Sequence, residues 1–472
     1  MRRTALLPTA LTIVALVAIG AGPLLAPHRL LQSQRTLEDI ARATSEGGHQ
    51  GDCDQCHTQH GNGPVVYGHA LVGPDENSLC EGCHNAPWAD STYAGAPVYE
   101  GSAHAAGSGT VWPGPDPAPR TEPGAAGKCL NCHDAHGLVD DAGRIPALTV
   151  QRGDRLCLAC HDGSPATTDI AADTRRGYRH DPGAPDRHTG PGESTPAEFG
   201  STPLNRRHAV CVDCHNPHVG TRDPAGPPPA PELSRALLGV SRLLVQNFGP
   251  GTAPQFTFLP ASDSLTTPRA EYQVCFKCHS TWTTPPNGQA DLPVELNPAN
   301  ASYHPVEAAG RNPVILPGAF VGAWSGMSVT SCGDCHGSNA DGAPRGPHGS
   351  DYRYILKAPY AVSTQARTMD ANELCFSCHT YDVYANPQAP EAVRAASRFN
   401  APATASGHAE HVGALQVPCA TCHVTHGAPN QPHLIVTGRL NGLTSYTETP
   451  AGGTCQAACH PQGQSYTINY AR

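Results

Sequence analysis

The twenty cysteines of this 472-residue chain all belong to ten short motifs of one kind. Nine motifs read Cys-x-x-Cys-His, and the tenth, at 455–460, has one extra residue between its two thiols. The cysteines are Cys53, Cys56, Cys80, Cys83, Cys129, Cys132, Cys157, Cys160, Cys211, Cys214, Cys275, Cys278, Cys332, Cys335, Cys375, Cys378, Cys419, Cys422, Cys455 and Cys459. The histidines that close the motifs are His57, His84, His133, His161, His215, His279, His336, His379, His423 and His460.

This spacing suits covalent attachment of a haem. Residues i, i+3 and i+4 of a helical turn share one face, so two thiols and one imidazole point the same way. Cys-x-x-Cys-His is the attachment signature of c-type haem. Structural zinc, a redox dithiol or a disulfide framework would not require a histidine at the same offset in every copy. We therefore predict ten covalently attached haems c, with the motif histidines as proximal iron ligands.

The remaining histidines predict the second ligand of each iron. The chain has 26 histidines and three methionines, and methionine is the usual competitor for that position. Most or all haems should therefore have two histidine ligands and a low potential. The distal candidates either trail a motif or precede a pair of motifs: His49, His60, His104, His136, His208, His218, His304, His348, His408 and His426. His180 competes with His208, and His411 competes with His408.

The motifs fall into five pairs, which we number units 1 to 5 along the chain. We expect units 1 and 2 at 49–180, unit 3 with a long insertion at 181–300, and units 4 and 5 at 301–472. Within the insertion, the apolar residues of 232–248 fit a helix or a strand. Residues 1–27 begin with Met-Arg-Arg and continue as an apolar run, which predicts a secretory signal peptide or a retained N-terminal membrane anchor.

The paired motifs, together with segments such as Cys211-Val-Asp-Cys-His-Asn-Pro-His218 and Gly346-Pro-His-Gly-Ser350, resemble the doubled CXXCH family of multihaem cytochromes. The resemblance covers nearly everything after residue 48. It implies a mostly irregular chain with short α-helices and little β structure, wrapped around a stacked haem array. It also implies electron transfer in the periplasm or at the cell surface of bacteria that respire external acceptors such as metals.

Composition is consistent with a chain that depends on its cofactors to fold. Glycine and proline supply 96 of 472 residues and aromatic residues only 6%, a balance that without cofactors favours disorder. The polypeptide has a formal net charge of −10, and each haem adds about −1 in the ferric state. This acidity argues against nucleic acid as a partner and favours basic protein surfaces or metal cations.

Three functions agree with these features. An electron relay between redox proteins is favoured, because two histidines on every iron leave no open position for a substrate. A multihaem oxidoreductase of the nitrite or hydroxylamine type is the alternative, and it would require an open iron, for instance at 455–460. A structural variant of the relay, self-assembled into a filament or placed at an outer-membrane barrel, uses the same chemistry. Every one of these readings places the protein outside the cytoplasm.

Overall fold

We analysed a computed structural model of the protein. It describes residues 56–57, 76–84, 99, 101–105, 129–181, 195–196, 209–261, 269–285, 289–312, 315–364, 370–399, 407–450, 452–460 and 466–469. Several predictions fall outside this part of the chain, namely the segment 1–27, Cys53, the side chain of Cys83, His49, His60 and His208.

The chain is low in regular structure and its helices are short. The helix α3 has nine residues, and the other α-helices are single turns of four residues. The α-helices are α3 (Glu76–His84), α5 (Arg155–Leu158), α6 (Ile170–Asp173), α7 (Cys211–Cys214), α8 (Tyr272–Cys275), α9 (Leu292–Glu295), α10 (Cys332–Cys335), α11 (Tyr381–Tyr384) and α12 (Glu391–Arg394).

Several 3₁₀ turns and one π-helical segment complete the helical structure. The 3₁₀ turns are η4 (Cys129–Asn131), η5 (Pro146–Leu148), η7 (Arg235–Leu237), η9 (Pro317–Ala319), η10 (Arg353–Ile355), η11 (Leu374–Ser377), η12 (Ala395–Ser397), η14 (Cys419–Thr421) and η15 (Pro432–Leu434). The π-helical segment is η13 (Ala409–Ala414).

The strands form small antiparallel sheets. β4 (Arg242–Gln246) pairs with β5 (Gln255–Leu259), and β1 (Val139–Asp140) pairs with β2 (Gly143–Arg144). A three-stranded sheet at the C-terminal end has the order β11 (Tyr466–Asn469), β10 (Gly452–Ala457), β9 (Leu443–Thr449). Two further pairs join residues far apart in sequence: β3 (Tyr178–Arg179) with β7 (Gly349–Ser350), and β6 (Ser302–Tyr303) with β8 (Gly427–Ala428). These two long-range pairs position the candidate site.

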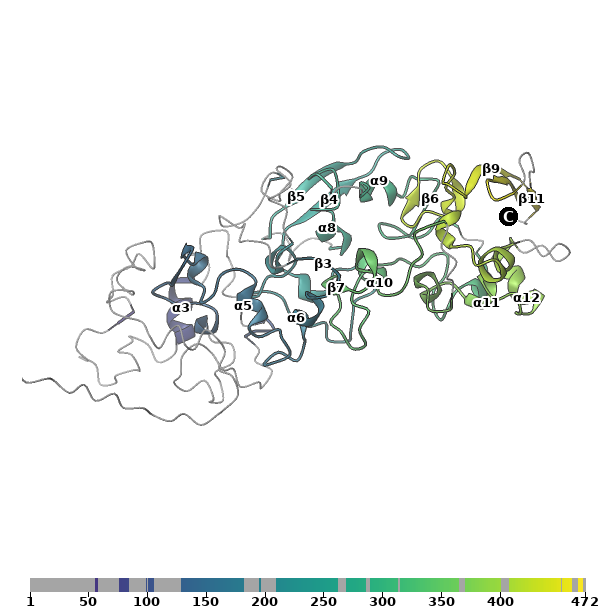
Figure 1. Ribbon diagram of the computed structural model, residues 1–472. Helices are drawn as coiled ribbons and strands as arrows, with labels where there is room; N and C mark the ends of the chain where they lie inside the picture. The colour runs from purple at the N-terminus through teal and green to yellow at the C-terminus, as the bar shows by residue number, and fades with distance from the viewer. Residues whose placement is uncertain are drawn as a thin grey trace, which may run out of the picture.

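The elements follow one another along an elongated molecule. α3 lies near one end, α5 and α6 come next, α10 lies near the middle, and the sheet of β9 to β11 lies at the other end (Figure 1). Hydrophobic packing is confined to small clusters, the largest of which is centred on Leu243, Phe276, Leu296 and Val306. Within the described ranges, the motifs therefore follow one another in sequence order, and the buried apolar residues form several clusters rather than one large core.

The segment 232–248 is not the long helix that its periodicity allowed. Only Arg235–Leu237 forms a 3₁₀ turn, and Arg242–Gln246 is strand β4, so the strand interpretation holds for the second half. Pairing with β5 favours the strand, because Leu243 becomes fully buried on one face while Leu244 is 38% exposed on the other.

Candidate functional site

Each described Cys-x-x-Cys-His motif from the third to the ninth is closed by the same hydrogen bond. The backbone N–H of the motif histidine donates to the carbonyl of the first cysteine at 2.8–3.0 Å, as in His133 to Cys129 and His215 to Cys211. This i→i−4 bond is one turn of α-helix. The helical turn expected from the spacing is therefore present in these motifs.

The tenth motif differs. Cys455 lies in strand β10, and the N–H of His460 donates to the carbonyl of Ala457 at 3.2 Å. The helical turn of the other motifs does not form here, because the pairing of β10 with β9 holds Cys455 extended opposite Tyr446. Ala458 and Cys459 form the turn that follows the strand and precedes His460.

The first motif of every unit has a second imidazole facing its proximal histidine. The two ring centroids lie 5.9–6.4 Å apart, and the ring planes are nearly parallel, with angles of 11–25°. The pairs are His57 with His136, His133 with His218, His215 with His348, His336 with His426, and His423 with His408.

The second motif of three units has an opposed imidazole at the same separation but a different inclination. His161 faces His104, His279 faces His180, and His460 faces His411, with centroids 6.1–6.2 Å apart and planes inclined by 49–88°. In unit 4, burial lowers the pKa of His379 to about 4, and the next largest cause is the charge of His304. The charge of His423 contributes too, but His423 already faces His408, which leaves His304 as the candidate partner of His379.

Most of these opposing histidines are delivered in pairs by what we call a histidine clamp, two histidines on adjacent chain segments that are joined by backbone hydrogen bonds. The clamps are His104 with His218, His180 with His348, and His304 with His426. The register of β3 and β7 continues to His180 and His348, and that of β6 and β8 continues to His304 and His426. At the clamp of His104 and His218, the Ala103 N–H donates to the Gly220 carbonyl at 2.9 Å.

A repeated hydrogen bond orients the clamps. Nδ1 of the first histidine meets the carbonyl of the residue that precedes the second: His104 with Pro217 at 3.0 Å, and His304 with Thr425. His180 has the same backbone partner at Pro347. Since the other ring nitrogen is then left as the acceptor, Nε2 of each is available as a metal ligand.

Two clamps require glycine after their second histidine. A Cβ at Gly349 would collide with the carbonyl of Asp173, and one at Gly427 would collide with the carbonyl of Glu295. These carbonyls end helices α6 and α9, so each helix end packs directly on the clamp.

The proximal histidines of the first motifs of units 2 to 5 are oriented by a second repeated feature. Nδ1 of each bonds at 2.8–3.0 Å to the carbonyl of the middle residue of a downstream 3₁₀ turn. The acceptors are Ala147, Ala236, Tyr354 and His433. Ala147, Tyr354 and His433 have φ of 55–64°, the left-handed region that ordinary residues seldom adopt. In three of the four turns, the residue that supplies the acceptor carbonyl therefore has an unusual backbone conformation. The bond to Nδ1 leaves Nε2 of the same ring available as a metal ligand.

The opposed imidazoles fit a metal ion between them. A metal–imidazole bond is about 2 Å long and the ring nitrogen lies about 1 Å from the centroid, so two such ligands place their centroids about 6 Å apart. Burial is the main cause that lowers the pKa of His218 and His336 to about 4 and of His408 to about 3. These imidazoles are therefore held neutral, the form that binds a metal.

Neighbouring motifs bring their thiols together in sequence order. Side-chain hydrogen bonds link the last motif of one unit to the first of the next, as in Cys157 with Cys211, Cys275 with Cys332, and Cys375 with Cys419. Within unit 4, burial first and then the charge of Cys378 raise the pKa of Cys335 to about 11, so these motifs are neighbours too. These contacts place the attachment positions of consecutive units next to each other from unit 2 to unit 5.

The structure also selects among the predicted distal candidates. His104, His136, His218, His348, His408 and His426 each face a proximal histidine, and His304 interacts electrostatically with His379. Of the two alternatives before unit 3, His180 faces His279, and His208 lies outside the described residues. His408 and His411 are not alternatives, because each faces a different motif histidine.

The sequence does not reveal which proximal histidine each trailing histidine faces. His136, His218, His348 and His426 each face the first motif of the preceding unit rather than their own. Their register on a bridge is a long-range property that no local pattern reveals, because histidine–glycine occurs at 348–349 and 426–427 but also at 60–61, 136–137 and 336–337.

Comparison with known proteins agrees with this geometry. Residues 122–166 and 326–383 match the family described as Doubled CXXCH motif, and these stretches contain the motif pairs of units 2 and 4. The chain carries the motif of a multihaem c-type cytochrome. The motif implies covalently bound haem c and is consistent with an electron carrier. Neither a curated protein nor a solved structure matches the chain.

Proposed function

We propose that this chain holds ten haems c in sequence order and relays electrons along them. The observation that carries the proposal is the set of opposed imidazoles about 6 Å apart, each including one motif histidine. A bound haem would supply one-electron redox chemistry at each position. The polypeptide attaches it through two thiols, orients both imidazoles and keeps neighbouring attachment positions in contact.

The distribution of histidines favours a relay over substrate conversion. An enzyme of the nitrite or hydroxylamine type needs an iron with an open position, and the expanded motif at 455–460 was the candidate for it. His411 faces His460 with ring centroids 6.2 Å apart, which supports two histidine ligands there as well. We therefore propose a carrier rather than a catalyst.

The cellular location and the redox partners of the protein are inferred from the chemistry of haem attachment and from the charge of the chain. We propose an exported protein of the periplasm or cell surface that exchanges electrons with other redox proteins and, beyond them, with external acceptors such as metals. The negative charge favours basic partner surfaces. None of the helices in the described ranges is long and apolar enough to span a membrane. Filament or barrel assembly would extend the same relay.

The proposal is tested on protein matured in a host that attaches haem c. We expect the intact mass to exceed that of the polypeptide by ten haems, the resting electron paramagnetic resonance spectrum to be entirely low-spin, and a redox titration to extend over many overlapping one-electron steps. A mass without this increment would overturn the haem assignment. A strong high-spin signal that responds to nitrite would overturn the relay in favour of the enzyme.

A further inference from the structure

Glu295, at the end of α9, contacts the clamp of His304 and His426 in two ways. Its backbone carbonyl packs on Gly427, where a Cβ would not fit. Its carboxylate Oε2 lies 3.1 Å from Nδ1 of His426, and the two side chains are 32% and 35% exposed. His426 therefore donates from Nδ1 to a carboxylate, while its ring faces His336.

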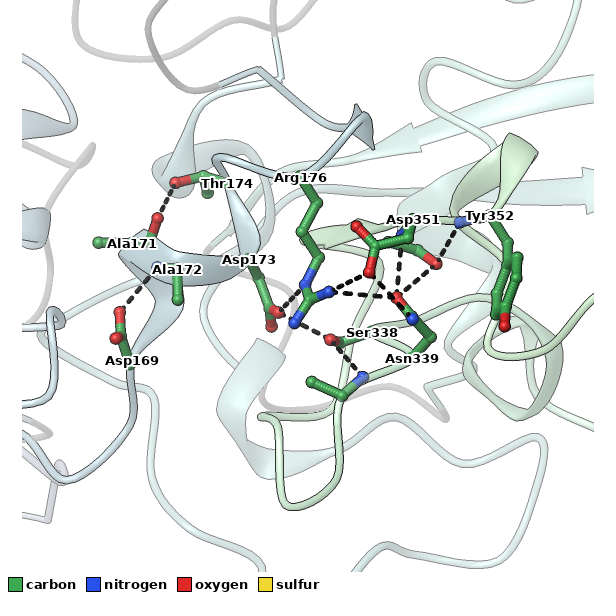
Figure 2. Close-up of polar contacts among 12 residues, drawn as sticks. Asp169, Ala171, Ala172, Asp173, Thr174, Arg176, Ser338, Asn339, Asp351 and Tyr352 are labelled. Atoms are coloured by element: carbon green, nitrogen blue, oxygen red, sulfur yellow. Dashed lines mark hydrogen bonds and ion pairs between the residues drawn. The ribbon is translucent and has the colours of Figure 1, made fainter.

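Asp173 occupies the equivalent place at the clamp of His180 and His348, but its carboxylate is engaged elsewhere. Its carbonyl packs on Gly349 at the end of α6. Its Oδ1 accepts hydrogen bonds from Arg176 Nε at 3.0 Å and from Ser338 Oγ at 2.7 Å (Figure 2). Arg176 in turn reaches Asp351 at 2.6 Å. A guanidinium thus neutralises the carboxylate that corresponds to Glu295.

His348 consequently has a different environment from His426. Its Nδ1 is buried and has no hydrogen-bond partner within the part of the chain that the structure describes, and the same is true of Asp173 Oδ2. The pairs His215–His348 and His336–His426 otherwise match, with centroids 6.2 and 6.4 Å apart and ring planes inclined by 23° and 25°. The two positions differ in what Nδ1 of the distal imidazole meets.

The chemical consequence follows from the charge of the acceptor. An imidazole that donates from Nδ1 to an anion becomes a stronger electron donor at Nε2, and hydrogen bonding around a ligand is one of the means by which a protein sets a haem potential. Stronger donation stabilises ferric iron. We propose that Glu295 lowers the reduction potential of the His336–His426 position below that of the otherwise matched His215–His348 position.

This inference rests on the proposed function, and Glu295→Gln tests it in the full haem-loaded chain. Glutamine keeps an oxygen acceptor for His426 and removes only the charge. We expect one one-electron transition to move upward by about tenfold in its equilibrium constant, about 59 mV, with the others unmoved and the spectrum still low-spin. Superimposable titrations of the variant and the wild type would overturn the inference.

Two further variants separate this effect from general electrostatics. Glu391→Gln removes the same charge from an exposed position on α12 and should leave every transition in place. An equal shift in both variants would overturn the role of the His426 contact. Arg176→Gln should release Asp173 toward His348 and move a different transition downward, and no such movement would overturn our account of the difference.

The number of bound haems distinguishes a failure of the Glu295 inference from a failure of the proposed function. If the pyridine haemochrome assay finds ten haems and Glu295→Gln changes no potential, the relay stands and the role of Glu295 is wrong. If that assay finds no haem in the wild type, the proposed function itself fails.

Discussion

Gly349 shows how a single side chain can decide whether a clamp forms. A methyl group there would collide with the Asp173 carbonyl, which cannot move without displacing α6. We expect Gly349→Ala to cost about 1–3 kcal/mol, as overpacking does, and to weaken His348 as a ligand. Thermal unfolding and the appearance of a high-spin signal measure the two effects.

Gly177 provides the matched control for this prediction. It lies one residue before the same bridge, and a Cβ there would meet no atom within 4 Å. Gly177→Ala should leave both the melting temperature and the low-spin spectrum unchanged. Equal behaviour of the two alanine variants would show that close packing at Gly349 does not hold the clamp.

Glu307 predicts a pH dependence of stability. Burial raises its pKa to about 7, only partly offset by the hydrogen bond from Asn247 at 2.7 Å. Because the folded state holds a proton that the unfolded state releases near pH 4.5, stability falls as the pH rises from about 4.5 to 7. Glu307→Gln should remove this decline and stabilise the protein at pH 8 by about 1–2 kcal/mol, after allowance for partial exposure.

Melting curves across pH 4–8 check the Glu307 prediction, with Glu391→Gln as an exposed control. The wild type and the control should lose stability in parallel as the pH rises, while the Glu307 variant should lose less. Parallel loss in all three would mean that Glu307 ionises in the native state at no cost.

At the scale of the elements, the short bridges present their two histidines at different inclinations. On one clamp, His218 lies nearly parallel to His133, at 17°, whereas His104 lies across His161, at 88°. Parallel imidazole planes split two iron d orbitals strongly, and crossed planes leave them nearly equal. We expect two classes of low-spin resonance signal, one rhombic and one highly anisotropic.

The clamp supplies its own matched variants for this prediction. His218→Ala should remove rhombic intensity, and His104→Ala should remove intensity from the highly anisotropic class. A spectrum with a single class, or the same loss from both variants, would contradict the alternation of ring planes along the array.

The motifs and the clamps differ in how far the sequence reveals them. A motif is local, since one helical turn fixes Cys129, Cys132 and His133 together, and spacing alone predicts it. The clamp of His180 and His348 joins residues 168 positions apart through a two-residue bridge, and no local pattern encodes that register. The acceptor turns are harder to predict than the motifs, because the left-handed residues Ala147 and Tyr354 are not of the types that usually adopt that conformation, although histidine, as at His433, is among them.

At the scale of the whole molecule, the clamps interlock units that are distant in sequence. The two imidazoles that face unit 3 come from before it, at His180, and from unit 4, at His348. The distal partners therefore cross the boundaries expected near residues 180 and 300. Cutting the chain between units would remove ligands from both sides, so the array should fold as a single piece.

A second regularity of the array predicts the distal partner of His84. In units 2, 3 and 5, a histidine upstream of the first motif faces the second motif histidine of the same unit: His104 with His161, His180 with His279, and His411 with His460. Applied to unit 1, the rule selects His49, which lies outside the described residues. Each of the ten motif histidines then has an opposing histidine without His60, although the sequence made both His49 and His60 candidates.

Paired alanine variants distinguish the two histidines. His49→Ala should convert one low-spin haem to high-spin, because the iron at His84 loses its second imidazole, and carbon monoxide should then bind one equivalent. His60→Ala should remain fully low-spin and bind none. The reverse result would show that unit 1 uses its own trailing histidine, His60. The pattern of distal ligands seen in the later units would then not extend to unit 1. The first unit therefore tests whether the repeat is a property of the fold or of its central part.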